Sequence, residues 1–290
     1  MTFARAHILA ACASGSLLCT VACVDISAGE ARYVDTTEKR FSVTGVPVVD
    51  VSTFDGTIDV STWARPEVLV VVEKHAVDKT AADRILVDAS QDGQRIAINV
   101  HRNDDRRLHV EFGSFSAHVT LTLPATAHLQ AHTGDGRVNI RQLAGDVHVQ
   151  TGDGAIRLEQ VTGPVFAASG DGSIEVDGAP QSVTLRSGDG RVHVRTSAAA
   201  AGADWRIATG DGPVVVEVPS SFGAVLDAST GDGRVRVDGL AFEDGGGDAT
   251  GRRSARGRIG AGGPRLEIRS GDGSITVRRA DADQAAELSR

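Results

Sequence analysis

Cysteine is scarce in this 290-residue chain, and its three copies, Cys12, Cys19 and Cys23, all lie near the N-terminus. The rest of the sequence therefore has no disulfide framework, and packed strands alone must stabilise the fold. Aromatic residues make up only 4% of the chain, which leaves few platforms on which bases or sugars could stack. The net charge is −8 and the basic residues are scattered, so nothing indicates nucleic-acid binding.

Long apolar runs are also missing, except at the N-terminus. Arg5 and His7 precede an apolar stretch over residues 8–23, which is too short to span a bilayer comfortably. This pattern is typical of a secretion signal. We therefore predict an exported protein with a signal peptide over residues 1–23 and a linker over 24–39.

The end of this segment resembles a bacterial lipoprotein box, with Thr20, Val21 and Ala22 before Cys23, although Thr20 replaces the usual Leu. The resemblance implies that Cys23 is the lipidation site and that two acyl chains anchor the protein to a membrane. Val24 resembles the residue that follows the cysteine in lipoproteins of the outer membrane. We expect an outer-membrane or periplasmic lipoprotein of the cell envelope. Cleavage near residue 22 or 28, giving a soluble secreted protein, is the alternative.

The most informative positive feature is the tetrapeptide Ser/Thr-Gly-Asp-Gly. Its first four copies are spaced by 18 residues, and the next steps are 22, 21 and 40. Such self-similarity is typical of a repeat architecture. The seven copies begin at Thr133, Thr151, Ser169, Ser187, Thr209, Thr230 and Ser270.

Aliphatic residues alternate with polar ones on both sides of each copy, as in Val147 and Val149 before Thr151 and Ile156 and Leu158 after it. Alternation of period two predicts two short strands per repeat, each with one buried face. The Asp-Gly pair supplies a turn. We predict an all-β fold, a β-solenoid (β-helix) with coils of roughly 18–22 residues. Hairpins in an antiparallel β-meander are the alternative, because Asp-Gly also favours hairpins.

The period breaks in two places. An imperfect copy over residues 53–56 is followed by longer strands, which we interpret as a cap over the first coil. Near the other end, glycines surround Arg252, Arg253, Arg256 and Arg258. This segment reads as a flexible loop, or as a basic loop that contacts anionic envelope material. The predicted sections are a strand-rich cap over 40–124, the repeat solenoid over 125–279 with an insert at 243–263, and a tail over 280–290.

The aspartates of the motif are the sharpest candidate site. Stacked coils would place them about 4.8 Å apart, where like charges repel unless something offsets them. Bonds to turn amides and hydroxyls would do so, and we interpret the column as structural. Calcium is the alternative, although calcium-binding rolls place ligands on both sides of each coil. The column is Asp135, Asp153, Asp171, Asp189, Asp211, Asp232 and Asp272.

No residue pattern indicates catalysis or a cofactor. The nine histidines have no metal-ligand spacing, and the Ser and Asp residues recur in every repeat, whereas a catalytic group is normally singular. We therefore expect that the protein is not an enzyme and that it binds no metal and no small-molecule substrate. A secreted polysaccharide-acting enzyme on a β-helix is the alternative. The polar face that could bind a partner carries Arg137, Arg157, Glu175, His193 and Arg236 in or beside one outward column.

A resemblance joins these features. Residues 49–63 read Val-x-Val-x-Thr-Phe-Asp-Gly-x-Ile-x-Val-x-x-Trp, the strand-rich section ends in Leu123-Pro124, and the repeats follow. Over residues 40–279 this resembles the bacterial putative-adhesin family of β-strand-repeat proteins, a domain of unknown function. The resemblance implies a β-helical, membrane-associated envelope protein. We expect a non-catalytic interaction or scaffolding module whose partner is an envelope protein or glycan, with a calcium-stiffened adhesin as a further alternative.

Overall fold

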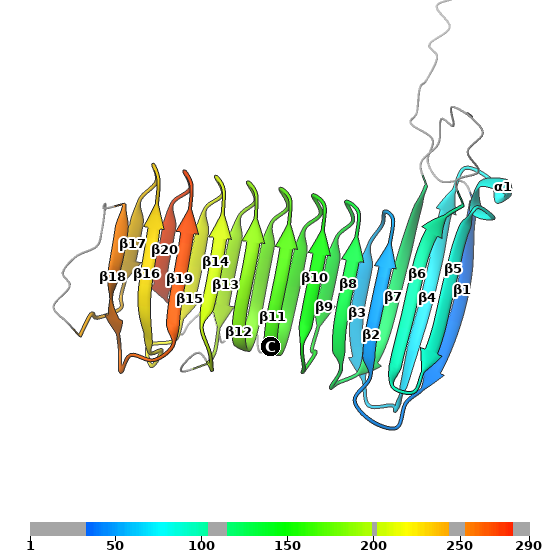
Figure 1. Ribbon diagram of the computed structural model, residues 1–290, viewed down its shortest axis with the longest axis horizontal. Helices are drawn as coiled ribbons and strands as arrows, with labels where there is room; N and C mark the ends of the chain where they lie inside the picture. Colours follow the sequence, from blue (N-terminus) through cyan, green and yellow to red (C-terminus); the bar gives the residue numbers. More distant parts are fainter. Residues whose placement is uncertain (1–32, 104–114, 199–201, 244–252, 281–290) are drawn as a thin grey trace, which may run out of the picture.

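The computed structural model describes residues 33–103, 115–198, 202–243 and 253–280. Their strands stand side by side in one long row (Figure 1). The only helix among these residues, α1 (Lys79–Ala82), lies at the N-terminal end of that row. The strands are β1 (Tyr33–Ser42), β2 (Val48–Thr53), β3 (Ile58–Trp63), β4 (Glu67–Ala76), β5 (Ile85–Asp92), β6 (Arg95–Arg102), β7 (Ser116–Pro124), β8 (His128–Thr133), β9 (Val138–Arg141), β10 (Val147–Thr151), β11 (Ile156–Ser169), β12 (Ile174–Ser187), β13 (Val192–Thr196), β14 (Trp205–Thr209), β15 (Val214–Val218), β16 (Ala224–Thr230), β17 (Val235–Asp238), β18 (Ser254–Ile259), β19 (Arg265–Ser270) and β20 (Ile275–Arg279).

The strand pairings form two ladders that run the length of the molecule. Ladder A contains, in spatial order, β5, β6, β2, β8, β10, the second half of β11, the second half of β12, β14, β19, β16 and β18. Ladder B contains β1, β4, β7, β3, β9, the first half of β11, the first half of β12, β13, β15, β20 and β17.

The repeats pair in parallel, as a stack of coils. Val147 pairs with Val165 and Ile156 with Ile174, so equivalent residues of successive motifs stand side by side. The antiparallel meander is therefore wrong for the repeats. Among the described residues, antiparallel pairs occur only at the two ends, as β1–β4, β4–β7 and β5–β6 at one and β16–β18 at the other.

The core lies between the two ladders and contains the aliphatic side chains that the alternation predicts. In β10, for example, Val147 and Val149 are buried and the residues after them are not. Leu143, which follows β9, and Val161, in the middle of β11, are also fully buried. Trp205 lies in the core against Phe222, with a distance of 5.7 Å between the ring centroids. The same short pattern, repeated in each coil, thus makes one continuous hydrophobic column.

The N-terminal section differs from the predicted cap in two ways. The expected linker over 24–39 overlaps β1, which begins at Tyr33. Its alternate positions are largely polar because β1 is an edge strand, so it lacked the hydrophobic signal that marks the others. The imperfect motif at 53–56 lies between β2 and β3, and these strands form a coil of the stack. That coil is inserted between β6–β7 and β8–β9.

The C-terminal end is rearranged in a similar way. The last coil, β19–β20, lies between β14–β15 and β16–β17, so spatial order departs from chain order. The predicted flexible loop over 243–263 is wrong for residues 254–259, which form β18, antiparallel to β16. The spacing of the motifs does not indicate this change of order, because each coil presents nearly the same edge to its neighbours. The predicted signal peptide, Cys23 and residues 281–290 of the tail lie outside the described residues.

Candidate functional site

The motif aspartates lie in one row of turns, and towards one end of that row their carboxylates accept hydrogen bonds from the backbone. The N–H of Asp135 donates to Oδ1 of Asp55 at 3.2 Å, and the N–H of Asp153 donates to Oδ1 of Asp135 at 3.3 Å. Asp171 donates to Asp153 in the same way at 3.3 Å. The carboxylates of Asp55, Asp135 and Asp153 thus each accept a bond from the next coil of the stack, and the series begins with the imperfect copy. Asp232, at the far end, pairs with Arg253 at 3.0 Å.

The hydroxyl groups of the motif join neighbouring coils. Ser169 Oγ donates to the carbonyl of Gly154, in the preceding coil, at 2.9 Å, and accepts the N–H of Gly172 at 3.0 Å. Thr151, Ser187 and Thr230 make the equivalent pair of bonds. Because these side chains are buried, the bonds are shielded from competing water. The motif therefore holds the coils together.

We expect Ser169→Ala to lower the free energy of unfolding by about 1–2 kcal/mol, because it leaves a buried carbonyl and a buried N–H without this partner. The midpoint of urea denaturation measures the change. The matched control is Ser173→Ala, an exposed serine in the next turn. Equal effects of the two substitutions would show that the buried hydroxyl does not link the coils.

A groove runs over the outer face of ladder B, across β9, β11, β12 and β13. Its volume is about 480 Å³, and a second hollow of about 460 Å³ adjoins it, sharing Arg141, Arg157 and Glu175. Six charged side chains of both signs and two amides line the groove. They are Arg141, Gln142, Arg157, Glu159, Gln160, Glu175, Asp177 and Arg195.

The coil structure itself places these side chains. Arg157 pairs in register with Glu175, and Glu175 with His193, so outward residues of successive coils form rows. Gln142 and Gln160 have φ of 59° and 54°, a left-handed conformation that is uncommon without glycine. In each case this conformation directs the next residue, Leu143 or Val161, into the core. The glutamine is therefore the last outward side chain on its side of the coil. The repeat thus makes a groove wall from residues 18 positions apart.

Ion pairs hold the charged side chains of the groove in place. Arg157 Nε lies 2.6 Å from Glu159 Oε1, and Arg141 Nε lies 3.0 Å from Glu159 Oε2. Arg195 reaches Asp177 at 3.7 Å. Burial raises the pKa of Asp177, and its neighbours Glu159 and Glu175 add to this shift while Arg195 opposes it. The groove is therefore an array of charges of both signs held by ion pairs.

Glu217 extends the same array along β15 and is nearly inaccessible, with 3% of its side chain exposed. It pairs in register with Arg195 on one side and with Arg278 on the other. Burial alone would raise its pKa, but hydrogen bonds from Arg278 and Arg195 outweigh that effect and lower the pKa to about 2. His193 Nε2 lies 3.5 Å from the same carboxylate.

Four of the five residues predicted to lie in or beside one outward column are in one row, and the fifth lies beside it. Arg157, Glu175 and His193 share one register, and Arg236 lies further along the same row, beyond β15 and β20. The position next to Arg157 in that row is Asn139, so Arg137 lies beside the row. Sequence reasoning missed the groove and Glu217, because both depend on contacts between coils.

Two other histidines contact side chains of the neighbouring coil. His148 stacks on Phe166 with 4.2 Å between ring centroids, and His128 pairs with Asp146 at 3.2 Å. In the part of the chain that the structure describes, no three His, Cys, Asp or Glu side chains are arranged to hold a metal ion. No helix among these residues is both long and apolar enough to cross a membrane.

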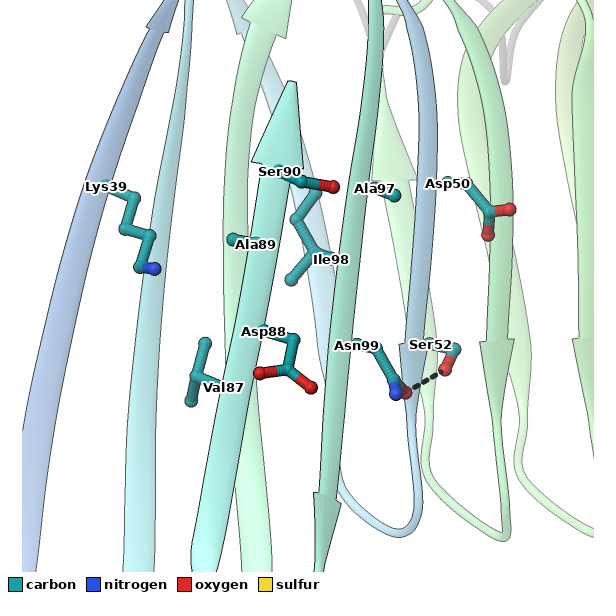
Figure 2. Close-up of a pocket in the computed structure, with 10 residues that line it drawn as sticks. All are labelled: Lys39, Asp50, Ser52, Val87, Asp88, Ala89, Ser90, Ala97, Ile98 and Asn99. Carbon is teal, nitrogen blue, oxygen red and sulfur yellow. Dashed lines mark hydrogen bonds between the residues drawn. The ribbon is translucent and has the colours of Figure 1, made fainter. Parts of the chain in front are cut away.

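A separate hollow of about 580 Å³ lies on ladder A near the N-terminal end. Figure 2 shows Ser52 and Asn99 joined across β2 and β6, where Ser52 Oγ donates to Asn99 Oδ1 at 2.9 Å. Asp88 lies beside Asn99 in this view, and Asp50 lies further along β2 from Ser52. Small outward residues, such as Ser90 and Ala97, leave the space open. Three charged residues line this hollow, against six in the groove of ladder B.

Comparison with solved structures gives distant matches. A putative cell adhesion protein from Clostridium sporogenes is 12% identical, with a TM-score of 0.41, and the match covers 86% of this chain and 100% of that one. A putative adhesin from Bacteroides fragilis is 8% identical, with a TM-score of 0.33 and coverage of 85% and 97%. A putative lipid binding protein from Parabacteroides distasonis is 12% identical, with a TM-score of 0.37 and coverage of 84% and 96%. None of these likenesses bears on function.

Among curated proteins, none matches the sequence. The family model described as Toastrack DUF4097 matches residues 64–278, which is most of the chain. This agrees with the resemblance to β-strand-repeat proteins of unknown function that the motifs indicate. The chain belongs to the Toastrack family, DUF4097.

Proposed function

We propose that this protein is a non-catalytic interaction or scaffolding module of the bacterial cell envelope, adhesin-like in its mode of action and anchored by a lipid on Cys23. Its partner is an envelope protein or glycan that binds across the outer face of ladder B. The observation that carries the proposal is the groove, whose charged side chains are held by ion pairs within and between coils.

A fixed array of this kind is suited to binding. Side chains that already hold one another lose little conformational entropy when a partner arrives. Charges of both signs suit a partner with hydroxyls or with charges of both signs, because the groove offers donors and acceptors. The stacked backbone beneath the groove keeps these groups at constant spacing.

The export signal supports the location. The apolar segment over residues 8–23 and the lipoprotein-like sequence before Cys23 favour attachment to a membrane from outside the cytoplasm. Since β1 begins at Tyr33, about ten residues separate the anchor from the solenoid. A short connection of this kind would hold the solenoid close to the lipid surface.

The test is photo-crosslinking in the native envelope with a photoreactive amino acid at one of two matched positions. Glu175 lies in the groove, and Thr184 lies on the same strand, β12, but on ladder A; both are half-buried. We expect a discrete protein or glycan adduct from position 175 and none from 184. Equal labelling from both positions, or none from either, would contradict binding at the groove.

Cys23→Ser in the same cells separates the anchor from the binding face. We expect the wild-type protein in the membrane fraction and the variant in the soluble fraction, because one substitution removes the acylated residue. Identical fractionation of the two proteins would contradict lipid anchoring. The crosslinking result would still decide, separately, whether a partner binds at the groove.

A further inference from the structure

We propose that the C-terminal end of ladder A binds phosphate groups through Arg256, Arg265 and Arg269. These arginines lie on β18 and β19, on either side of β16, and converge on Asp227 of β16. The site is on the other ladder from the groove and at the opposite end of the row of strands from β1 (Figure 1). It is therefore independent of the proposed function.

Asp227 organises the three guanidinium groups. Arg256 Nε donates to Oδ1 of Asp227 at 3.1 Å, and Arg269 Nη1 donates to the same oxygen at 2.9 Å. Arg265 Nη2 donates to Oδ2. Arg269 Nη1 also lies 3.1 Å from Ser229 Oγ. One carboxylate thus holds three arginines from two different strands in a defined arrangement.

The cluster is layered, with the acid beneath and the bases outside. Only 11% of the Asp227 side chain is exposed, against 71% for Arg256, 51% for Arg265 and 36% for Arg269. Hydrogen bonds from Arg269, then from Arg265 and Arg256, hold the pKa of Asp227 well below its usual range despite burial. The carboxylate therefore stays ionised, and the solvent-exposed groups of the cluster are mainly guanidinium groups.

The charges around the cluster do not cancel. Glu267 pairs with Arg269 at 3.2 Å and lies 3.9 Å from Arg206, which also reaches Asp204 at 3.8 Å. Among the groups joined by these contacts, the positive ones outnumber the negative ones by one, whereas the whole chain has a net charge of −8. The positive groups are Arg206, Arg256, Arg265 and Arg269, and the negative ones are Asp204, Asp227 and Glu267.

The geometry favours phosphate over a single carboxylate as the ligand. A guanidinium carries five N–H donors, and the bonds of Arg256 and Arg265 to Asp227 each involve one nitrogen. The same exposed groups therefore have further donors to offer. A tetrahedral phosphate presents enough oxygens to accept from several arginines at once, and paired N–H···O bonds of this type are among the strong ones. Because Asp227 already orders the arginine side chains, these side chains lose little further conformational entropy when phosphate binds.

The phosphate could belong to a phosphodiester polymer or to a lipid headgroup, and two arms of one experiment distinguish them. The full-length protein is titrated with soluble poly(glycerol phosphate), and it is co-sedimented with phosphatidylcholine vesicles that contain or lack phosphatidylglycerol. Binding in either arm supports the site and identifies the source of the phosphate. No binding in either arm at physiological salt would show that the cluster is structural only.

The decisive variant is Arg256→Gln, because its side chain is the most exposed of the three and Arg265 and Arg269 still satisfy Asp227. We expect binding to weaken about tenfold, which is the loss of one charge-assisted contact. The control is Arg279→Gln, an exposed arginine on β20, at the same end but on ladder B. Unchanged binding by Arg256→Gln, or an equal loss in the control, would overturn the proposal. Thermal melting of both variants verifies that each is folded.

Discussion

Replacing Gly172 with alanine should lower the free energy of unfolding by about 3 kcal/mol, at the upper end of what overpacking usually costs. A Cβ on Gly172 would overlap the carbonyl oxygen and carbon of Gly154 in the preceding coil. Both atoms belong to backbone that is bonded into the stack, so neither can move without disturbing the next coil. The glycine is needed because the two backbones approach so closely.

Chemical denaturation measures this loss, and Gly45→Ala is the matched control. The nearest atom to a Cβ on Gly45 is Cδ of Gln94, 3.8 Å away, which is ordinary van der Waals contact. We expect the free energy of unfolding of the control to lie within about 0.5 kcal/mol of the wild-type value. A similar small change for Gly172→Ala would mean that the coils are less tightly stacked than the structure shows.

Removing the buried carboxylate of Glu217 should cost about 3 kcal/mol in Glu217→Ala, because Arg195 and Arg278 would lose the acid that holds them together across three coils. The exposed pair of Glu38 with Arg40 offers the comparison, and Glu38→Ala should cost less than about 1 kcal/mol. Equal losses in the two variants would show that the burial of Glu217 adds nothing.

Acid should abolish the contribution of Glu217. Its pKa falls from 4.5 to about 2 in the folded protein, so its contribution is complete above pH 4.5 and is lost as the pH falls towards 2. The difference in free energy of unfolding between wild type and Glu217→Ala should therefore shrink over this window. A difference that stays constant with pH would contradict the role assigned to the ionised carboxylate.

The features that depend on local pattern could be predicted from the sequence. Alternation around each motif correctly placed the inward residues, such as Ile156 and Leu158, because a strand has only two faces. The motif spacing correctly indicated coils, since Val147 and Val165 stand side by side.

The features that depend on which coils meet could not be predicted. Glu217 contacts Arg195 and Arg278, which are 22 and 61 residues away in the chain, and neither separation is a signal in the sequence. The same is true of Asp227, whose arginines come from a segment that reads as a flexible loop and from the last coil. Outward positions tolerate any polar residue, so only the stacking order shows which of them meet.

The insertion of both terminal coils between others limits how such a protein can change in length. A copy added directly beside the first coil, β2–β3, or the last coil, β19–β20, would have no free edge to continue, because both coils are already enclosed on both sides. Between Thr133 and Thr209, neighbours in sequence are also neighbours in space. Duplication of one 18-residue unit there would lengthen the molecule by about 4.8 Å and leave both ends intact. Gene duplications that alter the reach of this protein should therefore be tolerated among its middle coils and rejected at its first and last coils.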